Sequence, residues 1–182
     1  NINKMSHEKY NQNKINYITL KSPKILKISS HPKKSFTNIV WEPKIVSGSK
    51  RVNALILPHA GLDIVFPFFE HAFSNIDYKY YDDIMLLCTD HSLSHTNYQT
   101  SYDLIDDFNI NLKTINKIKI DDKRFINEHS YLSVLPYIAK FKLPVYIIIV
   151  GNNTTDFDTI FNNLSTKTLL IANTDLLHCG KN

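Results

Sequence analysis

Residues 145–151 read VYIIIVG, a short apolar run that is rich in β-branched side chains and ends at a glycine. A run of this length and composition predicts a strand that is buried on both faces. Further short apolar runs of this kind stand at residues 52–57, 84–88 and 168–172. Strands buried on both faces are typical of parallel sheets covered by helices. The runs therefore predict an α/β fold with a largely parallel sheet.

The segments between these runs carry signals of helices. Residues 64–73 are apolar and aromatic, and residues 128–141 place apolar side chains at helical spacing in spite of Pro136. Residues 156–164 are a further helix candidate, and residues 98–105 alternate well enough to predict one more strand. This alternation of strands and helices predicts a sheet flanked by helices in a single domain.

Charge divides the chain of 182 residues into two parts. Residues 1–51 hold eleven Lys and Arg against two Glu, a net charge of +9, whereas residues 52–182 hold ten against fifteen acidic residues, a net charge of −5. We expect the first part to be a polar, basic N-terminal arm and the second to be the α/β domain. A lysine-rich arm of this kind is usually solvated. The sequence does not interleave aromatic residues with arginine in the way that is typical of specific nucleic-acid binding.

Cysteine content and hydropathy bear on location. Two cysteines, Cys88 and Cys179, are too few for a disulfide framework, so we expect a reducing compartment, the cytoplasm. The longest apolar run is far shorter than a membrane span. The first residues contain no apolar segment, so the sequence given does not predict a signal peptide. The sequence also lacks the phosphate-binding loops, the nucleophile elbow and the paired CxxC motifs of other common enzyme classes.

Three histidines, His59, His91 and His178, each stand a few residues after the end of a predicted strand. Because the carboxyl ends of parallel strands meet at one edge of a sheet, where open α/β folds bind ligands, we expect these side chains at one rim. Imidazole is a common ligand of iron, copper and zinc. The sequence therefore predicts a histidine-lined pocket that binds a transition metal, with a small molecule or a peptide as its partner.

Acidic residues near these histidines, Asp90, Glu128 and Asp175, can complete a two-histidine, one-carboxylate ligand set. We expect Asp175 to orient His178 through its ring N–H, with His178 as a third ligand or as the catalytic acid or base. Glu128 and His129 open a predicted helix. Either they point into the same rim as an orienting partner or a base, or Glu128 is there because an acid suits the first turn of a helix.

Five motifs stand in a defined order along residues 52–182. They are ALILPHAG at 54–61, MLLCTDH at 85–91, EHS at 128–130, VYIIIVG at 145–151 and NTDLLHCG at 173–180. This order is similar to that of the Memo family. The resemblance implies a LigB/Memo-like fold, related to the class III extradiol dioxygenases, whose active sites hold non-haem iron.

The resemblance also implies site residues and a cofactor. Matched motif by motif, the pocket histidines of the family fall on His59, His91 and His178. The family is cytosolic, and its animal members are linked to copper or iron binding and redox activity. We therefore expect a redox or dioxygenase-like protein with iron or copper as its cofactor, and with zinc as a further option.

The chain departs from the family pattern in three places. Residues 62–67 replace a Tyr and a Ser/Cys-Gly pair, and Ser92 replaces the second residue of a His-His pair. The chain also ends at Asn182, whereas the family continues with a Cys-Gly segment whose cysteine can be the third metal ligand. We expect either a fragment that lacks the C-terminal part of the family or a degenerate member with an incomplete site, in which Cys179 substitutes for that ligand.

Three functions therefore remain open from the sequence. The first is a metal-binding redox protein, such as a non-haem metal-dependent oxidoreductase. The second is a non-catalytic module whose histidines bind a peptide or an anion. The third is a structural remnant within a larger protein.

Overall fold

The structure is a computed structural model. It describes residues 51–60, 62–92, 95–101, 105, 108–152 and 156–174. The predicted N-terminal arm, apart from Arg51, lies outside the described residues. So does the segment 175–182, which holds Asp175, His178 and Cys179.

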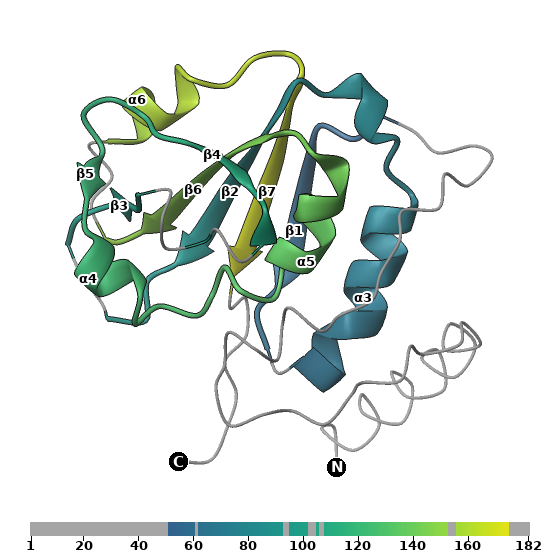
Figure 1. The fold of residues 1–182 in the computed structure, drawn as a ribbon, viewed down its shortest axis with the longest axis horizontal. Helices are drawn as coiled ribbons and strands as arrows, with labels where there is room; N and C mark the ends of the chain where they lie inside the picture. The colour runs from purple at the N-terminus through teal and green to yellow at the C-terminus, as the bar shows by residue number, and fades with distance from the viewer. Residues whose placement is uncertain are drawn as a thin grey trace, which may run out of the picture.

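A sheet of seven strands forms the centre of the described part of the chain (Figure 1). The strands are β1 Ala54–Pro58, β2 Asp83–Thr89, β3 Tyr98–Gln99, β4 Asn111–Lys113, β5 Lys119–Ile120, β6 Pro144–Val150 and β7 Thr168–Thr174. Their order is β1-β7-β2-β6-β3-β5, and β4 also pairs with β6. All pairs are parallel except that of β3 with β6. The prediction of an α/β fold with a largely parallel sheet is confirmed.

The last described strand, β7, lies between the first two, β1 and β2. Its register places Thr174 opposite Pro58 of β1 and Asn173 opposite Cys88 of β2. Because β1, β7 and β2 are parallel, their carboxyl ends lie at one edge of the sheet. Residues that follow β1 and β2 are therefore brought close to the end of β7.

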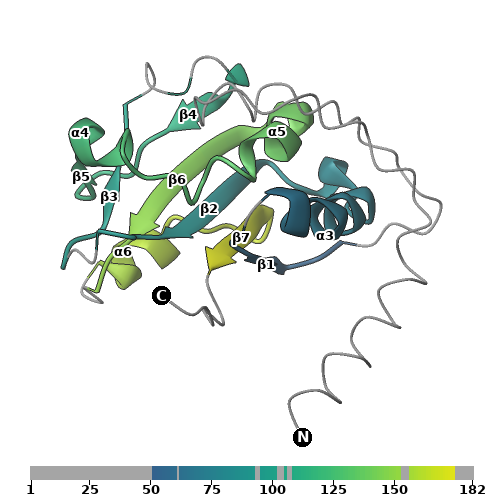
Figure 2. The same ribbon diagram turned by 90° about the horizontal axis from the view of Figure 1, so that it is seen from below.

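Helices lie on both faces of the sheet (Figure 2). One face carries α3 (Leu62–Ser74), α5 (Leu135–Ile138) and the 3-10 helix η3 (Ala139–Phe141), and the other carries α6 (Phe157–Phe161). Side chains alternate along each strand, so Leu86 packs in the core beneath α3 while Met85 packs in the core beneath α6. This double burial explains why β2, β6 and β7 are almost continuously apolar.

Aromatic rings join α3 to α5 and η3. The ring of Phe73 stacks on Tyr137 at a centroid distance of 5.0 Å, and Phe69 meets the same tyrosine edge-on at 5.6 Å. Phe73 also contacts Phe141 at 5.9 Å. Each of these rings is almost completely buried. The cluster therefore holds the helical layer together over the sheet.

The helix predicted over residues 128–141 is wrong in its first half. Turns occupy residues 130–134, and the helical segment begins only at Leu135. Pro136 is the physical reason, because proline lacks an N–H and its ring blocks the preceding turn, so that it suits only the start of a helix. Glu128 and His129 consequently lie in a loop instead of on a helix.

In the strand predicted over residues 98–105, Tyr98 and Gln99 are the only described residues that pair with neighbouring strands. Beyond them, the Thr100 hydroxyl and the Ser101 N–H donate to Asp122 Oδ1. Asp122 belongs to α4 (Asp122–Phe125), so these bonds tie the chain to a helix start instead of to a strand.

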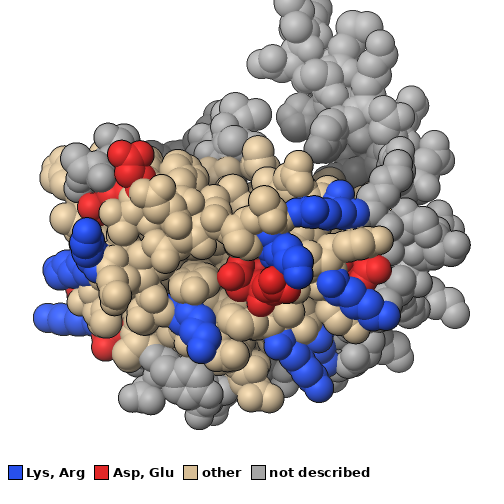
Figure 3. Space-filling model, turned by 90° about the horizontal axis from the view of Figure 1, so that it is seen from above, with Lys and Arg blue, Asp and Glu red and all other residues tan. Residues whose placement is uncertain are grey.

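Charged side chains of both signs are interspersed on the face drawn in Figure 3. The ion pair of Lys167 Nζ with Asp82 Oδ2, at 3.5 Å, joins two largely exposed groups, and pairs of this kind contribute at most about 1 kcal/mol. Burial of apolar side chains in the two cores is the larger source of stability, because it is the dominant favourable contribution to folding.

None of the described helices has the length and apolar content needed to cross a membrane.

Candidate metal centre

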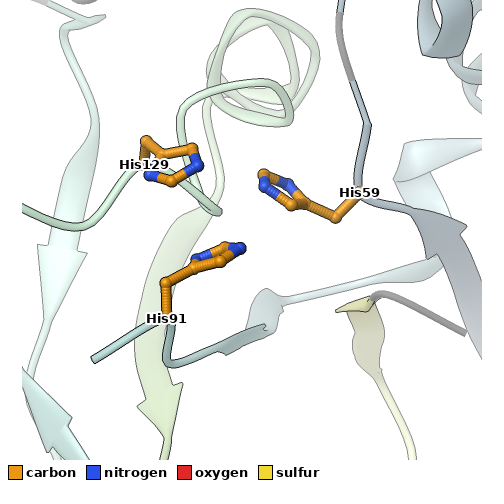
Figure 4. Close-up of side chains that lie close together, drawn as sticks. All are labelled: His59, His91 and His129. Carbon is orange, nitrogen blue, oxygen red and sulfur yellow. The ribbon is translucent and has the colours of Figure 1, made fainter. Parts of the chain in front are cut away.

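Three imidazole rings meet beyond the carboxyl edge of the sheet (Figure 4). His59 follows β1, and its N–H donates to the Thr174 carbonyl at the end of β7 (3.2 Å). His91 follows β2, and His129 comes from the loop before α5. The ring centroids lie 4.9 Å apart for His59 and His91, 5.2 Å for His59 and His129, and 4.4 Å for His91 and His129. One ring nitrogen of each residue lies within 4.8 Å of the other two.

This arrangement agrees only in part with the site predicted from the sequence. The structure brings His59 and His91 together, as the parallel strand order predicts, while their role as metal ligands stays a prediction. Among the described residues the third imidazole is His129, which the sequence suggested only as a base or an orienting partner. His178 and Asp175 lie outside the described residues, so their proposed roles stay predictions as well.

Glu128 binds His91 through both of its carboxylate oxygens. Oε2 accepts the His91 backbone N–H (2.9 Å), and Oε1 accepts the His91 ring Nδ1–H (2.8 Å). Oε1 also accepts the backbone N–H groups of His129 (2.7 Å) and Ser130 (2.8 Å). The side chain is 3% exposed. Four donors therefore converge on this carboxylate, and its bond to the ring Nδ1 holds the orientation of the His91 imidazole.

The charge of Glu128 follows from these bonds. Burial by itself raises the pKa of the carboxyl, but the hydrogen bonds from His91, Ser130 and His129 outweigh it and lower the pKa to about 2. An ionised carboxylate can only accept, so the His91 ring must donate its Nδ1–H to Glu128. When that ring is neutral, its lone pair is then on Nε2, which is the tautomer that binds a metal through Nε2.

The loop that carries His129 is fastened to the sheet by Asn173 of β7. The Asn173 side-chain N–H₂ donates to the Ser130 carbonyl and to Ser133 Oγ (3.3 Å). Asn173 is 1% exposed, and both of its partners are buried. This contact fixes the loop over the end of β7, between the positions of His59 and His91.

Neither Cys88 nor Asp90, a carboxylate that the sequence suggested for the ligand set, belongs to the group of potential ligand atoms among the described residues. Cys88 is buried beneath the cluster, and burial together with the negative charge of Glu128 raises the pKa of its thiol well above its ordinary value, so it stays protonated. Asp90 is paired with Arg124, whose Nη2 lies 2.9 Å from Asp90 Oδ2, and the aspartate side chain is 1% exposed. Neither group presents a ligand atom to the three rings.

The three histidines could hold a metal ion, but their nitrogens lie further apart than in a formed tetrahedral site. Bonds of about 2.0–2.1 Å to zinc imply nitrogen–nitrogen distances of about 3.4 Å. The observed limit of 4.8 Å therefore requires the rings to close by about 1.4 Å. The His129 side chain is 56% exposed and that of His91 is 32% exposed, so small ring rotations at the surface can provide this closure. A buried carboxylate that holds the Nδ1–H of one ligand histidine is a recurrent feature of metal sites.

Comparisons with known proteins do not identify the chain: no protein-family model matches it, and no curated protein sequence matches it. The resemblance to the Memo family therefore rests on the five sequence motifs. The site has to be interpreted from its own residues.

Proposed function

We propose that this chain binds a divalent transition metal through His59, His91 and His129. The observation that carries the proposal is the convergence of three ring nitrogens within 4.8 Å, beside a buried carboxylate that orients one of the rings. Glu128 is a buried carboxylate that accepts four hydrogen bonds, and one of them comes from the His91 ring. Its position is explained if His91 Nε2 has to be presented to a ligand.

Imidazole ligands favour zinc, copper and iron over magnesium and calcium, which prefer oxygen. A bound iron or copper ion would supply redox chemistry at this edge, as the Memo resemblance implies, and zinc would supply Lewis acidity. Within the proposal, His59, His91 and His129 hold the metal and Glu128 orients His91. His178 remains a candidate for a further ligand or for an acid or base, oriented by Asp175.

Metal content tests the proposal directly. We expect protein purified without a His-tag to contain close to one equivalent of iron, copper or zinc per chain by ICP-MS. The double variant His59→Ala/His91→Ala should fall to background because two of the three ligands are lost. His71→Ala, which removes an exposed histidine from the last turn of α3, is the matched control and should retain the metal.

Absence of metal in the wild type, even after anaerobic reconstitution with each ion, would contradict the proposal. Saturable binding of a peptide or an anion by the metal-free protein would then favour a non-catalytic module. Retention of metal in the double variant would place the metal at another site.

The third ligand is tested by single variants. We expect His129→Ala to weaken zinc binding at least tenfold, measured by competition with a chromophoric chelator, because a tetrahedral site would lose one of its protein ligands. His178→Ala, tested in parallel, shows whether the residue predicted from the sequence contributes as well. If His129→Ala binds zinc with the affinity of the wild type, His129 is not a ligand.

A further inference from the structure

Arg124 binds both neighbours of His91. Its Nη2 lies 2.9 Å from Asp90 Oδ2 and donates to Ser92 Oγ at 2.7 Å. Its Nη1 donates to Thr96 Oγ1 at 3.3 Å, further along the same loop. One guanidinium therefore holds the loop on either side of the histidine.

Asp90 anchors this arrangement from the side of the sheet. Its N–H donates to the Val150 carbonyl at the end of β6 (3.2 Å). Its Oδ1 accepts from the Ser92 N–H (3.0 Å), the Ser92 hydroxyl (2.6 Å) and the Tyr98 hydroxyl (3.2 Å). The guanidinium carbon of Arg124 lies 4.3 Å from the centre of the Tyr98 ring. A planar cation with several donors fits this place better than an ammonium group does.

Arg124 also lies just before the residues that complete the histidine cluster. It belongs to α4, and the Glu128 N–H donates to the carbonyl of the next residue, Phe125 (3.0 Å). The short segment from Arg124 to His129 thus contacts the His91 loop twice. Arg124 binds Asp90 and Ser92, and Glu128 binds His91 between them.

We infer that Arg124 is a positioning residue for the histidine cluster. By holding both neighbours of His91, it sets the spacing between His91 and His129 and keeps the His91 ring on Glu128. The inference deepens the proposed metal site and rests on it. It adds that the geometry of the site depends on a residue that does not touch the metal.

The test compares Arg124→Met and Arg124→Lys with the wild type and with Lys123→Met, which alters an exposed neighbour on the same helix. Zinc affinity is measured by chelator competition, and the coordination of Co²⁺ by its visible absorption. In the metal-free protein, long-range ¹H–¹⁵N spectra of the histidine rings report whether His91 carries its proton on Nδ1. All measurements are made well below the unfolding temperature of each variant.

We expect Arg124→Met to bind zinc about tenfold to a hundredfold more weakly, with weaker Co²⁺ absorption and a mixture of His91 tautomers. Arg124→Lys should recover part of the affinity, because its ammonium can pair with Asp90 but cannot reach Asp90, Ser92 and Thr96 together. Lys123→Met should match the wild type in every measurement.

Wild-type affinity and an unchanged Nδ1–H signal in folded Arg124→Met would overturn the inference. If Arg124→Met does not fold, Arg124→Lys is the deciding variant. Zinc affinity and a His91 tautomer equal to those of the wild type in Arg124→Lys would then overturn the inference. If the wild type itself binds no metal, the proposed function fails. The His91 tautomer in the metal-free variants then decides separately whether Arg124 positions the ring.

Discussion

Replacement of Glu128 by alanine is expected to destabilise the fold by about 3–5 kcal/mol. The variant leaves the backbone N–H groups of His91, His129 and Ser130 and the His91 ring N–H without their acceptor, in a place that is largely closed to water. Unpartnered donors of this kind carry the full cost of their desolvation. The loss is measured by urea unfolding followed by circular dichroism, with the metal removed by a chelator.

Asp158→Ala is the control for this prediction, because Asp158 is an exposed acid in the first turn of α6. We expect it to cost less than about 1 kcal/mol, as is usual for an acid at the start of a surface helix. A loss of less than about 1 kcal/mol in Glu128→Ala would show that the hydrogen bonds to this carboxylate do not stabilise the fold.

The same carboxylate predicts a dependence of stability on pH. Its pKa is lowered from 4.5 to about 2 in the folded chain, so the folded state favours the ionised form. The resulting stabilisation, at most about 3 kcal/mol, is fully present above pH 4.5 and is lost as the pH falls toward 2. Urea unfolding of metal-free protein at pH 6, 4 and 3 should show this loss in the wild type. Glu128→Gln should show a smaller decrease, and an equal decrease in both would contradict the assignment.

Phe73→Ala is expected to destabilise the chain by about 3–5 kcal/mol, the usual cost of removing a buried aromatic ring. Phe73 is 1% exposed and contacts Tyr137, Phe69 and Phe141, so its loss leaves a cavity between α3 and the α5–η3 segment. The measurement is again urea unfolding of the metal-free protein. The expected change is a lower midpoint with little change in the slope of the transition.

Ile64→Ala on the same helix is the matched control for Phe73→Ala. Ile64 is 53% exposed, so its truncation should cost less than about 1 kcal/mol. A similar loss in both variants would mean that burial in the aromatic cluster does not account for the effect of Phe73→Ala. A small loss in Phe73→Ala alone would mean that the cluster collapses to fill the cavity.

The apolar runs of the sequence predicted the positions of β1, β2, β6 and β7, but β1 is an edge strand in which only Leu57 is buried, and not the strand buried on both faces that its run predicted. Strands buried on both faces leave a signal within six or seven consecutive residues, and β2, β6 and β7 lie where those runs stand. The prediction of residues 128–141 as one helix failed, because helical spacing alone did not show how strongly Pro136 limits the start of a helix. The strand predicted over residues 98–105 begins as expected, but Thr100 and Ser101 bond to the distant Asp122 instead of continuing it.

By itself, the sequence determined the α/β class and the placement of His59 and His91 at one edge, because each follows directly on a strand whose direction is set by the parallel sheet. Only the tertiary structure decided that His129 joins them. Its position depends on Asn173 of β7, which is 43 residues from Ser130, and on the bonds between Glu128 and His91, which are 37 residues apart. Local patterns report which side chains are buried along one element. Which loops meet is determined by the order of the strands, and β7 lies between β1 and β2 only in the folded chain.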